Sequence, residues 1–282
     1  QRIDIHLRRN KTKGIAINGI PIKKASELFG VFNVVIFSPE DLEIIKKGPA
    51  ERRKFIDMEL CQLDKIYVYN LTNYNKIIIQ RNKLLKDIYF RPELKQTLEV
   101  WDNQLAEYGS KIIKRREKFI KEINNIIKPI HKKLTGGVED INIVYNKNCE
   151  AEDLLKILKE NRERDIKYKS TSVGPHKDDI LFFQKDKNIR IYGSQGQQRT
   201  VALSLKLAEI ELVKTLINDL PVLLLDDVLS ELDSDRQNHL LKNLDNIQTV
   251  ITCTGLDEFI ENRFKINKVF QVTDGNIEEK TV

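Results

Sequence analysis

Two adjacent carboxylates, Asp226 and Asp227, end the most apolar run of the chain, VLLLDD (222–227). Apolar residues on both faces are typical of a central strand in a parallel sheet, and ligands bind at the carboxyl ends of such strands. One carboxylate could hold Mg²⁺ through water, and the other could orient or deprotonate a water that attacks a phosphate. A strand that runs into an acidic turn without further function is the alternative, and the stretch alone does not decide between them.

A second stretch, GSQGQQR (193–199), predicts the start of a helix that runs to about residue 217. The first-turn N–H groups of a helix lack partners, and its dipole favours an anion. Ser194 and Gly196, a small hydroxyl and a glycine, would let a phosphate approach this backbone. An ordinary Ser/Gly helix start is the alternative. The spacing adds information, because one helix and a turn separate Ser194 from Asp226 and SELD (230–233) follows.

Two other groups of residues are weaker candidates for a metal site or a disulfide framework. GPHKDD (174–179) offers His176, Asp178 and Asp179 as metal ligands, but no second histidine or cysteine pattern accompanies them, which favours a structural turn that braces the hairpin before GSQGQQR. The three cysteines lie far apart and form no CxxC pair. That argues against a zinc site or a disulfide framework and predicts a reducing cytoplasm.

The net charge of +6 is unevenly distributed along the 282 residues. Residues 111–133 hold nine Lys/Arg against two Glu, and residues 8–24 hold six Lys/Arg and no acid, whereas residues 219–235 hold six acids and no base. This separation suggests a polyanion for the basic regions and a metal or cationic group for the acidic one. A solvated helix face is the alternative for each basic run. No apolar run approaches the roughly 18–20 residues of a membrane span.

The periodicity predicts an α/β chain with a long helical insertion. Strands are expected within 1–37, and Ser38 and Pro39 are suited to start a short helix. Two long amphipathic helices over 50–134, broken at Arg91-Pro92, predict an antiparallel hairpin. A strand (138–145), a helix (151–164) and a strand hairpin formed by DILFF (179–183) and NIRIY (188–192) follow. After the helix at 194–217 we expect a buried strand at 222–227, a helix at 232–244, a buried strand at 249–254 and a closing hairpin.

The combination SQGQQ, LLLDD and SELD resembles the C-terminal half of the ATP-binding-cassette (ABC) ATPases, as signature motif, Walker B strand and D-loop. The longer strings VVIFSPEDLEIIKKGPAERRKFID (34–57), SVGPHKDDI (172–180) and SQGQQRTVALSLKLAEIEL (194–212) resemble, over nearly the whole chain, the RecF family of bacterial DNA replication and repair proteins. The resemblance implies an ABC-type ATPase core, a P-loop NTPase-like sheet with flanking helices, that carries a helical-hairpin insertion. Residues 1–45 and 166–282 would form the ATPase lobe, and 46–165 the insertion.

The resemblance also implies roles for individual residues. Asp226 would lie in the Mg²⁺ shell of bound ATP, and Asp227 would position or activate the hydrolytic water. Ser194 and Gly196 would touch the γ-phosphate of an ATP held by a second subunit. The remaining implied site residues support the signature loop or face the partner across the dimer: Gln195, Gln197, Ser230 and Asp233. Ser38, Pro39 and Glu40 stand at the Q-loop position without matching its glutamine.

Two features depart from the ABC pattern. No GxxxxGK[ST] phosphate-binding loop (Walker A) occurs, and no switch histidine follows the last core strand, where ITCTG offers only Thr252 or Thr254. The resemblance places the Walker A loop before Gln1, so we expect an N-terminally truncated chain that is inactive alone. In the complete protein it implies a weak, DNA-stimulated ATPase. The alternative is a non-catalytic binding or structural fragment that cannot bind ATP.

The implied function is ATP-dependent DNA binding in replication restart, recombinational repair and the SOS response. Two subunits would dimerise on DNA with ATP, hydrolyse it slowly and help to load a recombinase at single-strand gaps. The implied partners are DNA at single-/double-strand junctions, a second copy of the chain and recombination mediator proteins, in the cytoplasm and at the nucleoid, with no membrane. Basic side chains on the β segment and on the helical hairpin are the predicted DNA contacts: Arg8, Arg9, Lys11, Lys13, Lys111, Lys114, Arg115, Arg116 and Lys118.

Overall fold

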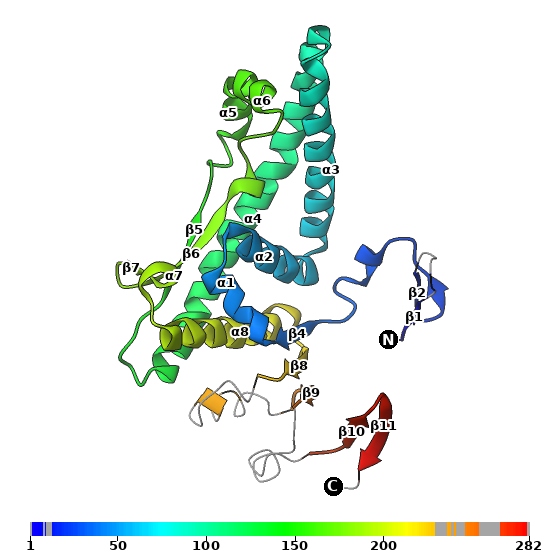
Figure 1. Ribbon diagram of the computed structural model, residues 1–282, viewed down its shortest axis with the longest axis vertical. Coiled ribbons are helices and arrows are strands. Elements are labelled where there is room, and N and C mark those ends of the chain that lie inside the picture. The colour runs from blue at the N-terminus through cyan, green and yellow to red at the C-terminus, as the bar shows by residue number, and fades with distance from the viewer. Residues whose placement is uncertain are drawn as a thin grey trace.

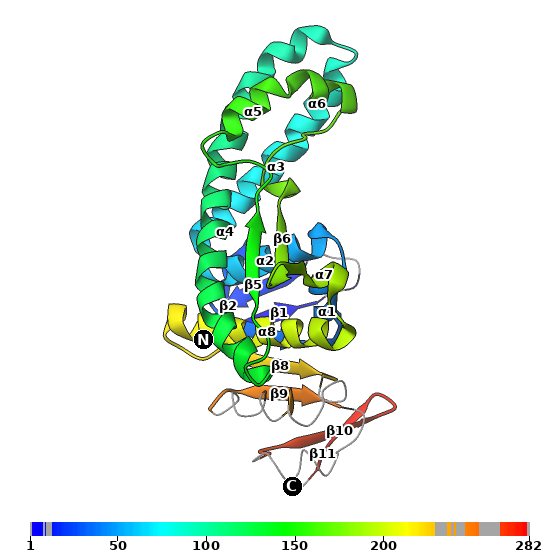
Figure 2. The ribbon, with the colours of Figure 1, turned by 90° about the vertical axis from the view of Figure 1, so that its left-hand side faces the viewer.

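The computed structural model describes residues 2–7, 9, 13–228, 236–237, 240, 246–253 and 266–280. They form a long helical arm that rises from a lobe built around helix α8 (Gln195–Ile217) and a parallel sheet (Figure 1). Helix α4 (Leu98–Leu134) runs the length of the arm and reaches the lobe at its C-terminal end (Figure 2). The predicted α/β class with a helical insertion therefore matches the architecture of the described residues.

Three parallel strands form the centre of the lobe in the order β4–β8–β9, which are Val34–Phe37, Val222–Asp226 and Thr249–Thr252. Leu223 and Leu225 of β8 are buried against α8, whose residues Val201 to Ile210 are all buried. Strand β8 lies between β4 and β9 and is parallel to both, which confirms the prediction that VLLLDD forms a central strand of a parallel sheet. The expected burial of β9 is not observed among the described residues, because Val250 is 52% exposed.

The other strands form antiparallel sheets. Strands β1 (Ile3–His6), β2 (Gly14–Ile17) and β3 (Ile20–Pro21) form one, and β10 (Val269–Thr273) and β11 (Asn276–Lys280) form the predicted closing hairpin. The third contains β5 (Asn142–Asn146), β6 (Asp179–Gln184) and the two-residue β7 (Lys187–Asn188). The predicted strand NIRIY is wrong beyond Asn188, because the next four residues form the short helix α7 (Ile189–Tyr192), capped by the Asn188 side chain.

The arm is an antiparallel helical hairpin, as predicted, made of α3 (Lys65–Ile88) and α4. Asp64 caps α3 by accepting hydrogen bonds from the N–H groups of Ile66 and Tyr67, so α3 is separate from α2 (Pro49–Leu63). Between the long helices, the chain turns through a short 3₁₀ segment (Pro92–Thr97). Two helices, α5 (Leu154–Glu160) and α6 (Arg162–Tyr168), replace the single one expected over 151–164.

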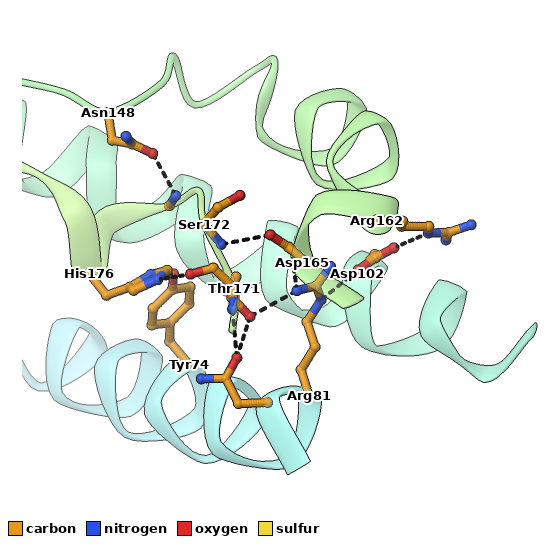
Figure 3. A network of polar contacts seen from close by, with 11 residues as sticks. Tyr74, Arg81, Asp102, Asn148, Arg162, Asp165, Thr171, Ser172 and His176 are labelled. Atoms are coloured by element: carbon orange, nitrogen blue, oxygen red, sulfur yellow. Dashed lines mark hydrogen bonds and ion pairs between the residues drawn. The ribbon is translucent and has the colours of Figure 1, made fainter. Parts of the chain in front are cut away.

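A buried arginine ties the far half of the arm together (Figure 3). The Arg81 guanidinium on α3 donates to Asp102 of α4 at 2.8 Å, to Asp165 of α6 at 2.7 Å and to the Thr171 hydroxyl. Arg162 donates to the second oxygen of Asp102. Because Arg81, Asp102 and Asp165 are fully buried, these groups must compensate one another's desolvation, and they fix the positions of three helices.

The division of the chain at residue 165 stays a prediction. Strand β5, inside the predicted insertion, pairs along its whole length with β6, inside the predicted lobe. The short α1 (Leu42–Lys46) and α2 also pack against α8, and the Arg52 guanidinium of α2 binds Asp179 of β6 through two hydrogen bonds. Among the described residues, no helix is both long and apolar enough to cross a membrane.

Candidate functional site

Asp226 and Asp227 lie at the carboxyl end of β8, where Thr252 of the neighbouring strand contacts both. Asp226 is exposed, and its Oδ1 accepts a hydrogen bond from the Thr252 hydroxyl at 2.5 Å. The Asp227 N–H donates to the Thr252 carbonyl oxygen at 3.2 Å and faces its hydroxyl oxygen at 3.3 Å. Asp227 has a φ of +50°, which is uncommon outside glycine and turns the chain sharply at this residue. The strand end therefore presents a carboxylate to solvent on a fixed backbone.

Ser38 lies at the same edge, because β4 is parallel to β8. Ser38 precedes a 3₁₀ turn (Pro39–Asp41), and its N–H donates to the Asp41 carboxylate at 2.9 Å. A small pocket of about 50 Å³ opens here, and Ser38, Asp41, Arg199, Lys206 and Val228 are among its lining residues. Burial raises the pKa of Asp41, although Lys206 opposes that shift. The predicted helix start at Ser38–Pro39 is confirmed, whereas the Q-loop role of these residues stays a prediction.

The loop at Ser194 is a helix start held by a reciprocal cap. The Gln197 N–H donates to the Ser194 hydroxyl at 3.2 Å, and the Ser194 N–H donates to the Gln197 side-chain oxygen at 2.9 Å. Gly196 is exposed, and a Cβ placed there would meet only the Ser194 hydroxyl oxygen, at 3.9 Å. The N–H groups of Gln195 and Gly196 have no hydrogen-bond partner among the described residues. They are the part of the cap that an anion could use.

Gln197 connects this loop to the foot of the arm. Its side-chain amide donates to Glu139 and to Gln184, both at 3.0 Å. Glu139 lies 3.7 Å from His131 Nε2 at the end of α4, and His131 Nδ1 is 2.9 Å from the Ser204 hydroxyl. Burial lowers the pKa of His131. Residues outside α8 therefore hold the signature-like loop (Ser194–Gln197) in place. The polar contacts run from Gln197 through Glu139 and His131 and return to α8 at Ser204.

A second group of acids is buried next to the sheet edge. Lys206 of α8 donates to Glu209, and its positive charge also faces Glu59 of α2 and Asp41. Burial alone would lower the pKa of Lys206, but the three carboxyl groups outweigh it and raise that pKa. Burial raises the pKa of Glu59 well above its usual range, and Glu209 raises it further. Lys206 therefore stays charged, and Glu59 favours its protonated form.

The described residues of the predicted site are not all connected by hydrogen bonds. Among the described residues, the hydrogen bonds of the Ser194 loop run to Glu139 and Gln184, and none reaches Asp226. Ser230 and Asp233 lie outside the described residues, as do Arg8 and Lys11. Arg9 and Lys13 are described and exposed. The helix start and the strand end are thus not joined by a hydrogen bond, although Arg199 and Val228 both line the small pocket.

The predicted DNA contacts on the arm are mostly paired with acids. Lys111 binds Glu107, Lys114 binds Glu152, and Lys118 lies 3.8 Å from Glu122. These three lysines remain exposed. Arg115, which directly follows Lys114, binds Asp64 and Glu122. For these four residues a DNA contact stays a prediction.

Arg116 requires a correction. Its side chain is buried, and its guanidinium donates to Asp57, to the Tyr67 hydroxyl and to the Pro175 carbonyl oxygen. Arg115 and Arg116 follow one another along α4, so they point in directions about 100° apart, and only Arg116 is fully buried. Arg116 holds the arm to the segment around Pro175 and is not available to a DNA phosphate.

The GPHKDD segment makes structural contacts, as the sequence favours, but these contacts support the arm, whereas the sequence suggests the hairpin before GSQGQQR. His176 Nδ1 lies 2.7 Å from the Tyr74 hydroxyl of α3, and its Nε2 faces the Thr171 carbonyl oxygen. Burial lowers the pKa of His176 to about 4, so the ring is neutral at physiological pH. Asp178 accepts from the Asn148 N–H. No group of three or more potential metal-binding side chains occurs among the residues described.

Sequence reasoning missed several contacts of the site. It names Thr252 only as one of two alternatives at the switch-histidine position, and the contact of Thr252 with Asp226 depends on the β8–β9 register, which a strand pattern does not specify. Glu139 and Gln184 reach Gln197 from distant segments and give no local signal. A charged residue inside an otherwise apolar helix is the signal that could have identified Lys206.

A helix start open to an anion and a carboxylate at the end of a central parallel strand are features of α/β nucleotide-binding proteins. No family model matches the chain. It is 64% identical to the DNA replication and repair protein RecF of Lachnospira eligens, over 98% of this chain and 77% of that protein, and 61% identical to that of Agathobacter rectalis, over 98% and 76%. The chain therefore belongs to the RecF family of DNA replication and repair proteins.

Solved structures agree with this assignment. The structure of the recombination mediator protein RecF-ATPrS in the RecFOR pathway covers 99% of this chain, with a TM-score of 0.90 and 37% identity, and 76% of that protein is matched. The corresponding RecF-ATP structure gives a TM-score of 0.89 at the same identity and coverage. The mixed α/β fold described above is thus that of RecF, a family with members solved in complex with ATP.

Proposed function

We propose that this chain supplies half of a composite ATP site in an ATP-driven, DNA-binding dimer that acts in recombinational repair and replication restart. One observation carries the proposal: the Ser194 helix start and the Asp226 strand end are both exposed, and no hydrogen bond joins them among the described residues. A site in which the helix start of one subunit meets the phosphates held at the strand end of another accounts for both surfaces.

The residues present fit Mg²⁺ and a nucleotide. Asp226 offers an exposed carboxylate oxygen, the ligand type that Mg²⁺ takes, usually together with waters. When bound, the metal ion would neutralise charge that develops on the phosphates. Asp227 would hold and deprotonate the attacking water, and Thr252 would keep the Asp226 carboxylate in position.

The helix start would recognise the terminal phosphate of the other subunit's ATP. The free N–H groups of Gln195 and Gly196 would donate to phosphate oxygens, and the Ser194 cap would keep them oriented. The Gln197 contacts with Glu139 and Gln184 would hold the loop as the dimer closes. Slow hydrolysis would then release the dimer from DNA, after it has helped to load a recombinase at a single-strand gap together with mediator proteins.

Two variants of the complete protein test this assignment. Ser194→Arg places a long side chain where the second subunit's phosphates would lie, so ATP binding by the monomer should persist while ATP-driven dimerisation is lost. Asp227→Asn should dimerise with ATP but lower turnover by at least about 100-fold, the usual contribution of a general base. Light scattering and phosphate release measure the two effects. Normal dimers with Ser194→Arg, or normal turnover with Asp227→Asn, would refute the corresponding role.

The alternative is a non-catalytic binding or structural fragment, favoured by the absence of a GxxxxGK[ST] sequence in these 282 residues. An ATPase assay of the 282-residue chain alone, beside the complete protein, separates the two. Turnover in both would show that the chain itself contains a sufficient phosphate site, whereas turnover in neither would favour the alternative.

A further inference from the structure

Three lysines line an open concavity at the foot of the arm. Lys128 and Lys132 lie one turn apart near the end of α4, and Lys185 lies in the turn between β6 and β7. The concavity has a volume of about 380 Å³, and the remaining lining comes from Pro129, Asp140, Ile141 and Asn142. With three lysines and one aspartate, its lining carries a charge of +2. The concavity lies at the C-terminal end of α4, which Figure 2 shows next to α8.

The lysines of this concavity are unpaired, unlike those higher on the same helix. Lys111 and Lys114 each bind a glutamate, at 2.8 Å in both cases. Within the part of the chain that the structure describes, Lys128, Lys132 and Lys185 are exposed and form no ion pair. Like charges gathered around one concavity repel each other, and an anionic ligand would relieve that repulsion.

The concavity lies beside the signature-like loop. Gln197 of that loop donates to Glu139 and Gln184, the immediate sequence neighbours of the lining residues Asp140 and Lys185. A ligand here would therefore touch the segments that hold Gln197 in place. This location connects the basic surface to the site that the proposed function assigns to ATP.

We propose that the concavity formed by Lys128, Lys132 and Lys185 binds phosphate groups of the DNA backbone. Lysine ammoniums are mobile point charges that attract phosphates without reading base edges, and no aromatic side chain lines the concavity to stack on a base. The same lack of a stacking surface disfavours a free nucleotide as the ligand. The inference rests on the proposed function in taking DNA as the polyanion.

The test is a triple substitution in the complete protein, K128Q/K132Q/K185Q, with K76Q/K83Q/K86Q as the matched control. The control removes the same charge from three exposed lysines of α3 that line no such concavity. Binding to a fluorescent duplex with a single-strand tail is measured with a non-hydrolysable ATP analogue over a salt series. The concavity variant should lose affinity by roughly 10- to 100-fold at 0.1 M salt, and its slope of log affinity against log salt should become shallower by about 2–3. The control should change both by much less.

The outcomes separate the inference from the proposed function. Equal losses in both triple variants would overturn the inference, because they would reflect net charge alone. Undiminished DNA binding in the concavity variant would also overturn the inference. If that variant keeps its DNA binding but loses ATP-driven dimerisation, the phosphates that the concavity binds would be those of a nucleotide. If the unmodified protein dimerises with ATP but binds no DNA, the proposed function fails together with the inference. Circular dichroism checks that both variants fold.

Discussion

Two groups of acids lie near each other in the lobe, in opposite surroundings. Glu59 and Glu209 are 4% and 1% exposed and surround Lys206, whereas Asp226 is exposed and contacts Thr252. The small pocket between β4 and α8 is lined by Lys206 of the first group and by Val228, which follows the second. The buried acids are compensated inside the protein. The exposed carboxylate keeps coordination sites that a ligand can fill.

The difference shows that the number of acids does not identify a metal site. The buried cluster has more carboxyl groups than the strand end, but Lys206 offsets part of their charge, and burial raises the pKa of Glu59, which favours its neutral form. One oxygen of Glu59 is buried without a hydrogen-bond partner in the described structure. Such a cluster stabilises one arrangement of α2 and α8, whereas a metal needs carboxylates that stay ionised and accessible.

Removal of Lys206 should have the largest effect on stability. Lys206→Met leaves the carboxyl groups buried without a cation, and breaking a buried pair in this way costs about 3–5 kcal/mol. The melting temperature should fall by on the order of 10 °C. Urea and thermal unfolding followed by circular dichroism measure both quantities.

Lys214→Met is the matched control for Lys206→Met. Lys214 lies on the same helix and binds Glu211 three residues before it, but both side chains are partly exposed. Exposed pairs contribute at most about 1 kcal/mol, so the control should remain close to the parent protein. Similar losses in the two variants would show that the burial of Lys206 is not what makes it important.

Glu59→Gln should have an intermediate effect that depends on pH. Burial raises the pKa of Glu59 in the folded protein above its usual value of 4.5, so the folded protein binds this proton more tightly than the unfolded chain does. The free energy of unfolding therefore decreases as the pH rises above that value, by up to about 1.4 kcal/mol per pH unit for one proton. Glutamine carries no such proton, so the variant should show a shallower decrease between pH 5 and 7. Urea titrations across this range measure the slope, and an unchanged slope would mean that Glu59 is ionised in the fold.

Local patterns were sufficient for the elements that carry the site. The apolar run before Asp226 predicted the central strand, and Ser194 predicted the start of α8, because a cap and a buried strand are encoded by adjacent residues. Family resemblance, rather than any local signal, connected the two stretches into one composite site. Whether Ser194 faces a second subunit stays a prediction for the same reason.

Burial of individual charges was not predictable from the sequence. Arg115 and Arg116 are identical neighbours in a basic run, yet only Arg116 is enclosed, because Tyr67 and Pro175 come from segments far along the chain. Lys206 is buried because Phe37 of β4 and Phe55 of α2 pack against it, in the part of α8 where Val201 to Ile210 are all buried. Such compensation depends on tertiary contacts, which residue spacing along one helix does not reveal.

Asp226→Asn should have the smallest effect on stability and a clear effect on ligand binding. The amide oxygen can still accept from the Thr252 hydroxyl, so the free energy of unfolding without ligand should change by less than about 0.5 kcal/mol. In the complete protein, a ligand at 100 times its dissociation constant stabilises the fold by about 2.7 kcal/mol. Asparagine loses the charge that attracts Mg²⁺, so the stabilisation by ATP with Mg²⁺ should shrink in the variant, while that by ATP without Mg²⁺ should not. A large loss without ligand would place Asp226 with the buried acids, whereas equal stabilisation by ATP with Mg²⁺ in both proteins would remove it from the metal site.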